Sequence, residues 1–192
     1  MAEIKSALEL ALEKAESYGR ASKEEMAQLQ HQEQGRQLAV QFFKEAGDLA
    51  AELGKLPAAA QTAARQAAKE VFLRNIGFPR AEGVDDRLGR ALDGLLRAAA
   101  NPKAMLRLKA ELEQLLQQYQ QIRQNASQQL KARFAGGMNQ LQRAMEAQTG
   151  SRVRLEPEQL PQYQEEWRRF LGSLQEQFDP MLEGLKERMR QA

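Results

Sequence analysis

The scarcity of β-branched residues is the feature of this chain that most constrains its fold. Only 9 of the 192 residues are Val, Ile or Thr, whereas 30 are Ala and 25 are Gln. Strands are enriched in β-branched side chains, which pack well on a pleated surface, while Ala and Gln are good helix formers. Too few β-branched residues remain for a sheet of any size. We therefore expect an all-α protein.

The spacing of apolar residues, together with the positions of proline and glycine, predicts six helices. They cover residues 2–31, 36–53, 57–76, 85–99 and 102–148, and a last helix begins near Pro157 or Pro161. Asp85 and Asn101 are residue types that favour N-cap positions. Asp179–Pro180 is expected to kink or restart the last helix, because proline lacks the amide hydrogen that a helix interior needs.

A coiled-coil-like seam is predicted on the fifth helix. Its apolar residues alternate spacings of three and four over three heptads, which is the pattern of helices that pack knobs-into-holes. The seam consists of Met105, Leu108, Leu112, Leu115, Tyr119 and Ile122. Spacings of four then continue to Met138, a stutter-like shift that unwinds a supercoil locally. Gly136–Gly137 lies in this shifted part and would be the place for a kink, a hinge or an end.

The last helix has an aromatic stripe at helical spacing. Its members are Tyr163, Trp167, Phe170, Leu174 and Phe178. Such a stripe could form a ligand pocket or an anchor for a partner, but at helical spacing it is more often core. We expect residues 101–192 to form a long antiparallel helical hairpin, coiled-coil-like, on which residues 1–100 pack as a small helical bundle. The two parts should form one cooperative unit.

A stripe of small residues marks the third predicted helix. Ala60, Ala63, Ala64 and Ala67 recur at spacings of three and four. Small side chains leave room for a second helix to approach closely, so we expect a tight helix contact on this face.

The residue types exclude several kinds of chemistry. The chain has no cysteine and one histidine, which excludes disulfides, thiolate metal sites and His-pair metal sites. His31 lies near the end of a predicted helix, where the helix dipole favours a solvated histidine. The adjacent carboxylates Asp85–Asp86 and Glu165–Glu166 point about 100° apart on a helix and do not converge on one substrate. The glycines between residues 83 and 94 match no phosphate-binding loop. We expect no catalytic residue, no metal ligand and no cofactor, and hence a protein that is not an enzyme.

The basic segment 97–133 raises the alternative of nucleic-acid binding. It contains seven basic and two acidic residues, a net charge of +5, while the whole chain carries only +2. Nucleic-acid binding requires Lys and Arg clustered on one face. Lys103 and Arg107 share a face, but Lys109 and Lys131 project elsewhere. A solvated polar face is therefore the favoured interpretation, and nucleic-acid binding is the second hypothesis.

The opening stretch Ile4–Lys14 resembles the start of a family of uncharacterised bacterial helical proteins. The resemblance implies a bacterial source and a cytoplasmic setting, and it brings no activity and no functional residues. No secretory signal pattern is present at the start of the chain. The longest unbroken apolar run, Leu56–Ala60, is far shorter than a membrane span. We expect a cytoplasmic protein without a membrane association.

These observations predict a scaffold or adaptor that acts through helix–helix contacts. The expected contact surfaces are the seam between Met105 and Ile122 and the stripe between Tyr163 and Phe178. We expect a homo-oligomer, and an unknown protein partner is compatible with the same surfaces. Sequence alone leaves open whether the seam pairs within one chain or between chains.

Overall fold

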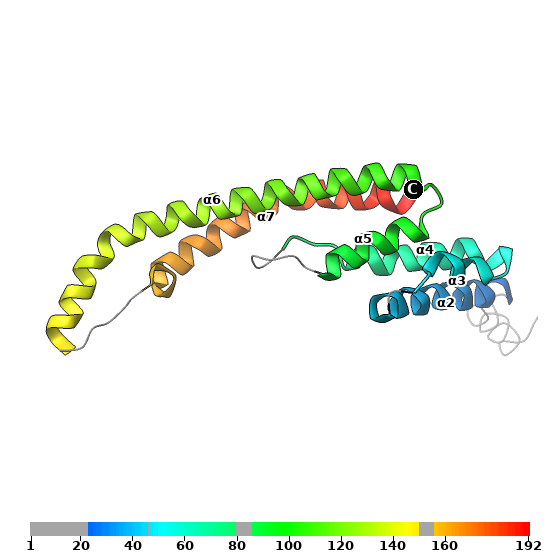
Figure 1. Ribbon diagram of the computed structural model, residues 1–192, viewed down its shortest axis with the longest axis horizontal. Helices are drawn as coiled ribbons and strands as arrows, with labels where there is room; N and C mark the ends of the chain where they lie inside the picture. Colours follow the sequence, from blue (N-terminus) through cyan, green and yellow to red (C-terminus); the bar gives the residue numbers. More distant parts are fainter. Residues whose placement is uncertain (1–22, 46, 80–85, 150–155) are drawn as a thin grey trace, which may run out of the picture.

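The computed structural model describes residues 23–45, 47–79, 86–149 and 156–192, and its described part consists of helices without a strand (Figure 1). The all-α prediction is confirmed. The helices are α2 (Lys23–Glu45), α3 (Leu49–Lys55), α4 (Ala58–Arg74), α5 (Asp86–Ala98), α6 (Pro102–Thr149), the short 3-10 helix η1 (Pro157–Gln159) and α7 (Pro161–Gln191). We call α2–α5 the bundle, and α6 with α7 the arm.

Helices α2 and α4 are held together by small residues. Gly35 of α2 is buried, and a Cβ atom at this position would collide with the carbonyl group of Ala64 in α4. Ala60, Ala64 and Ala67 are themselves buried on the face of α4. The alanine stripe of α4 therefore serves as a close-packing surface, and its partner is α2.

The predicted boundary between the first two helices is wrong for the same reason. Helix α2 runs without interruption through residues 31–36, because Gly35 is an internal packing position and not a helix end. His31 accordingly lies within α2 and not at a helix C-terminus. The chain turns later, before Asp48, whose side chain accepts a hydrogen bond from the amide of Ala51 at 3.1 Å and caps α3.

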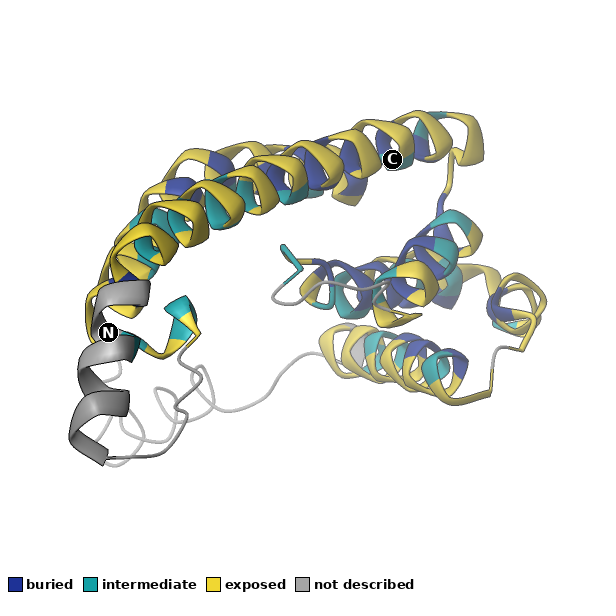
Figure 2. Cartoon of the chain, turned by 60° about the vertical axis from the view of Figure 1, so that its left-hand side comes forward, coloured by how far each residue is buried: buried dark blue, intermediate teal, exposed yellow. Residues whose placement is uncertain are grey.

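The arm is formed by two long helices that run in opposite directions side by side (Figures 1 and 2). Arg188 of α7 pairs with Glu111 of α6 at 2.7 Å, and Lys131 of α6 pairs with Glu158 at 2.6 Å. These two pairs lie at different points along the arm and fix the antiparallel direction. Asn101 caps α6 as predicted, through a hydrogen bond from the amide of Ala104 to its side-chain oxygen.

Both long helices continue through the positions of the expected interruptions, and α6 curves toward its C-terminal end (Figure 1). Helix α6 continues through Gly136–Gly137 to Thr149, and a helix of 48 residues is about 72 Å long at 1.5 Å per residue. Helix α7 continues through Pro180, so the predicted restart is wrong. Burial of apolar α7 side chains against α6 stabilises a continuous α7 more than the loss of one backbone hydrogen bond at the proline destabilises it. Leu174, Phe178, Leu182 and Leu185 are such positions.

An aromatic cluster joins the bundle to the arm. Phe78, just after α4, stacks on Tyr119 of α6 with ring centroids 4.2 Å apart, and the edge of Phe178 of α7 meets both rings. The core is continuous across this junction, from Ala39 in α2 to Met189 in α7. The bundle therefore packs on one half of the arm.

A buried lysine makes a second connection at the C-terminal end of the arm. Lys69 is 5% exposed, and its amine donates a hydrogen bond of 2.8 Å to the backbone carbonyl of Arg190. Burial lowers the pKa of this amine, and the neighbouring carboxylate of Glu70 opposes the shift. The Arg190 side chain also pairs with Glu70. Helix α4 therefore holds the last turn of α7 through both the backbone carbonyl and the side chain of Arg190.

Several predictions fall outside the described residues. These are the helical part before Lys23, the Asp85 N-cap and the turn at residues 150–155.

Candidate functional site

The arm has a groove on the part that the bundle does not cover. Seven residues of α6 and α7 line a volume of about 400 Å³, which we call the arm groove. They are Ala126, Gln129, Leu130, Arg133, Glu166, Trp167 and Phe170. Two antiparallel helices alone bury one seam between them, so side chains beside the seam keep part of their surface in water.

Aromatic side chains form one wall of the arm groove. Trp167 and Phe170 lie on α7, both half-buried, and their rings stack with centroids 5.4 Å apart. Behind them Tyr163 is buried, with Phe134 of α6 against its ring at 5.6 Å. Phe170 also packs against the core, so the stacked pair is held in place while part of each residue remains accessible, and a partly accessible aromatic pair can serve as a binding surface.

Helix α6 extends the apolar surface beyond the aromatic wall. Ile122, Ala126 and Leu130 are separated by four residues each and therefore share one face of the helix. Ile122 is 42% exposed, although the heptad pattern placed it in the seam. The apolar face of α6 thus becomes exposed to solvent at Ile122 and continues along the helix to the residues that line the groove.

The groove carries one acidic and one basic side chain that pair across it. Arg133 of α6 forms an ion pair with Glu166 of α7, and both side chains are about half exposed. An exposed ion pair contributes little to folding stability and can exchange partners. The arm groove therefore combines an apolar floor with one charge of each sign.

The remaining predicted contact residues lie in the core of the arm. Met105, Leu108, Leu112, Leu115 and Tyr119 of α6 are buried, as are Leu174 and Phe178 of α7. They belong to one cluster that also contains bundle residues, so this part of the seam pairs within the chain. Of the predicted residues, Ile122 is exposed, and Trp167 and Phe170 are partly buried.

Most basic side chains of the basic segment form ion pairs or hydrogen bonds within the chain. Its basic side chains pair with acidic neighbours at four positions: Arg97 with Asp93, Lys109 with Glu113, Lys131 with Glu158 and Arg133 with Glu166. Arg123 donates a hydrogen bond to the carbonyl of Pro79 at 3.0 Å. The net charge of the segment therefore overstates the charge that it presents to a polyanion.

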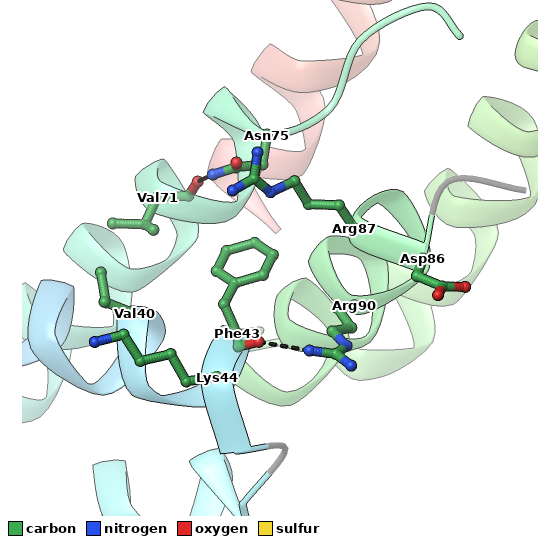
Figure 3. Close-up of a pocket in the computed structure, with 8 residues that line it drawn as sticks. All are labelled: Val40, Phe43, Lys44, Val71, Asn75, Asp86, Arg87 and Arg90. Atoms are coloured by element: carbon green, nitrogen blue, oxygen red, sulfur yellow. Dashed lines mark hydrogen bonds between the residues drawn. The ribbon is translucent and has the colours of Figure 1, made fainter. Parts of the chain in front are cut away.

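A second pocket lies in the bundle, between α2, α4 and α5 (Figure 3). It has a volume of about 750 Å³, and we call it the bundle pocket. Its lining comes from three helices and consists of Val40, Phe43, Lys44, Val71, Asn75, Asp86, Arg87 and Arg90. Sequence patterns did not indicate this pocket, because no single helix has more than three of these residues and their spacing follows no motif.

The described residues show no arrangement that suggests a metal or a membrane. Across residues 23–45, 47–79, 86–149 and 156–192, no three acidic or histidine side chains come together to hold an ion. In the same part of the chain, no helix is long and apolar enough to cross a bilayer. Glu165 and Glu166 pair with different arginines, Arg169 and Arg133, and face different surroundings.

Comparison with known families places the chain. Residues 50–191, from the start of α3 to the end of α7, match DUF6657, a family of unknown function. The chain belongs to this family. The DUF6657 match covers the whole arm and most of the bundle, and it does not include the Ile4–Lys14 stretch whose resemblance suggested an uncharacterised family. No curated protein and no solved structure matches the chain.

Proposed function

We propose that this DUF6657 protein is a non-enzymatic scaffold that self-associates through the arm groove, with a second copy of the chain as the occupant. The observation on which the proposal depends is the partly buried Trp167–Phe170 wall of the arm groove, continued by exposed Ile122, on the part of the arm that the bundle leaves open. Apolar patches of this kind on soluble proteins mark interaction sites.

The charges of the groove favour a second copy over an unrelated helix. In a two-fold symmetric pair the same patch lies on both sides of the interface. If the two-fold axis passes close to these residues, Arg133 of one copy faces Glu166 of the other, and each existing ion pair can be exchanged for an intermolecular one. The patch is therefore self-complementary in charge as well as in apolar character.

The geometry of helix packing supports the same occupant. A second arm laid along the groove would convert two helices into a four-helix bundle, the arrangement in which antiparallel helices bury their apolar faces on both sides. The seam from Met105 to Tyr119 is already paired within the chain and is not needed for this contact.

The test is the solution mass of the full chain measured by light scattering over a range of concentrations. The wild type should show multiples of 21.7 kDa, and Trp167→Glu should weaken self-association about tenfold or more, since an aromatic anchor is replaced by a charge. Met181→Glu is the matched control, because Met181 lies on the same helix, is 53% exposed and is outside the groove.

Three results would contradict the proposal. These are a monomer at every concentration, equal effects of the two substitutions, or self-association that disappears on nuclease treatment, which would favour the nucleic-acid hypothesis. Circular dichroism of both variants checks that they remain helical. Ile122→Glu provides a second test of the groove at an exposed position that folding does not require to be apolar.

A further inference from the structure

Helix α2 carries an apolar stripe on its exposed side. Met26, Leu29 and Val40 are 51%, 53% and 45% exposed, and we call these three residues the α2 stripe. At 100° per residue they lie within about 60° of one another around the helix axis. The buried positions Gly35 and Phe42 lie on the other side of α2, which faces the rest of the bundle. The α2 stripe is therefore a second apolar face of this helix, separate from the face that packs on α4.

The segment that precedes α2 carries a matching stripe in its sequence. Apolar residues recur there at spacings of three and four, as in an amphipathic helix. They are Ile4, Leu8, Ala11, Leu12 and Ala15, and they lie outside the part of the chain that the structure describes. On one uninterrupted helix Ala15 and Met26 would be about 20° apart, so both stripes would point to the same side and stay in water. A turn between them would bring the two stripes face to face.

The residues between the two stripes have the pattern of such a turn. Glycine commonly follows the last residue of a helix, and Gly19 comes four residues after the end of the first stripe. Ser22 and Glu25 have the spacing of a capping box, which marks the start of a helix, and α2 is described from Lys23, directly after Ser22. Antiparallel helices are joined by loops of about two to five residues, and residues 19–22 fit this length.

We propose that residues 4–18 fold back as a helix antiparallel to α2 and cover the α2 stripe. In a hairpin with its turn at residues 19–22, residues equally far from the turn lie opposite each other. Leu12 then faces Leu29, and Ala15 faces Met26. A helix over residues 4–18 is about 22 Å long and the α2 stripe about 21 Å, so the segment reaches the end of the stripe at Val40.

The contact is driven by removal of both apolar stripes from water. It uses the exposed side of α2 and no residue of the arm groove. The inference therefore does not rest on the proposed self-association, and either can fail without the other.

Disulfide formation within the full chain tests the predicted facing pair. The chain has no cysteine, so Leu12→Cys with Leu29→Cys introduces a single pair of thiols. Leu12→Cys with Gln34→Cys is the matched control, because Gln34 is an exposed residue of the same helix, about 140° around the axis from Leu29. After mild oxidation in dilute solution, the Leu12–Leu29 pair should close within one chain at least about tenfold more than the control, since a disulfide requires neighbouring Cβ atoms.

Hydrogen–deuterium exchange of the full chain gives a second measurement. Amides of residues 4–18 should exchange at least about tenfold more slowly than in an unfolded chain. Met26→Glu with Leu29→Glu should remove this protection, while Gln34→Glu should leave it unchanged. Both substituted stripe positions are exposed, so the bundle itself should remain folded.

Four results would overturn the proposal. The first two are equal disulfide yields for the two pairs and disulfides that form only between chains. The third is exchange of residues 4–18 at the rate of an unfolded chain. The last is protection that survives the two stripe substitutions, which would show that the segment is helical without contacting α2.

Discussion

At the scale of single residues, glycine and alanine determine how closely α2 and α4 approach. The contact depends on the absence of a side chain at Gly35, opposite the backbone of Ala64. The alanine stripe in the sequence predicts a close helix contact, but the predicted helices end at residue 31 and resume at residue 36, which puts Gly35 in a gap between them. The residue type alone did not distinguish the two roles, because glycine both ends helices and permits close approach.

Gly35→Ala should destabilise the protein by about 1–3 kcal/mol, because the added methyl group forces α2 away from α4. Gly54→Ala is the matched control, since a Cβ at Gly54 in α3 meets open space. The control should be neutral or stabilise the protein by up to about 1 kcal/mol, as alanine favours helices. Urea unfolding of both variants measures the difference. Equal stability of the two variants would show that the helices do not touch at Gly35.

At the scale of helices, the apolar pattern predicted the arm well up to Tyr119. Beyond that position the pattern extends to Ile122 and then shifts to spacings of four, and Ile122 is 42% exposed. Sequence spacing gives the face of a helix but not which other helices lie against it. For this reason the spacing predicted the buried seam, but it could not tell that Trp167 lines a groove and does not lie in the core.

The double substitution Leu112→Glu with Leu115→Glu should unfold the arm, not merely dissociate an oligomer. Both leucines are buried in the core that joins α6 to α7, so each variant side chain would bury an unpaired charge. We expect a loss of more than about 3 kcal/mol in the free energy of unfolding. Leu106→Glu, at a 55% exposed position of the same helix, should change stability little. Loss of mass without loss of helicity would show that this seam pairs between chains.

Ion pairs across the arm make its stability depend on pH. The hydrogen bond from Arg188 lowers the pKa of the Glu111 carboxyl, and the hydrogen bond from Lys131 lowers that of Glu158. A carboxyl with a lower pKa in the folded state stabilises the protein above its ordinary value of about 4.5 and loses this effect as the pH falls through the folded pKa.

Chemical unfolding between pH 6 and pH 3 measures this contribution. The free energy of unfolding should fall below about pH 4.5, and the fall should be smaller in Glu111→Gln with Glu158→Gln. Glu176→Gln, an exposed position of α7, should retain the wild-type slope. Parallel curves for the double variant and the wild type would show that these pairs do not contribute.

At the scale of the whole molecule, the bundle and the arm share one core but differ in how they are covered. Phe78 and Lys69 fix the bundle to one half of the arm. Among the residues that the structure describes, the arm groove in the other half is lined by α6 and α7 alone. Composition predicted the fold class because the fold class depends on the residue types of the whole chain. Which half of the arm the bundle covers depends on contacts between residues far apart in the sequence, such as Phe78 and Tyr119. Local sequence patterns do not predict such contacts.

The most direct test of self-association through the arm groove is cross-linking between copies. The chain has no cysteine, so Ile122→Cys introduces a single thiol beside the groove, and Met181→Cys introduces a control thiol elsewhere on the arm. With a short bismaleimide linker, a groove-to-groove pair predicts covalent dimers for Ile122→Cys and few for Met181→Cys. Equal yields for the two variants, or no covalent dimer from Ile122→Cys at concentrations where the wild type self-associates, would contradict the proposed interface.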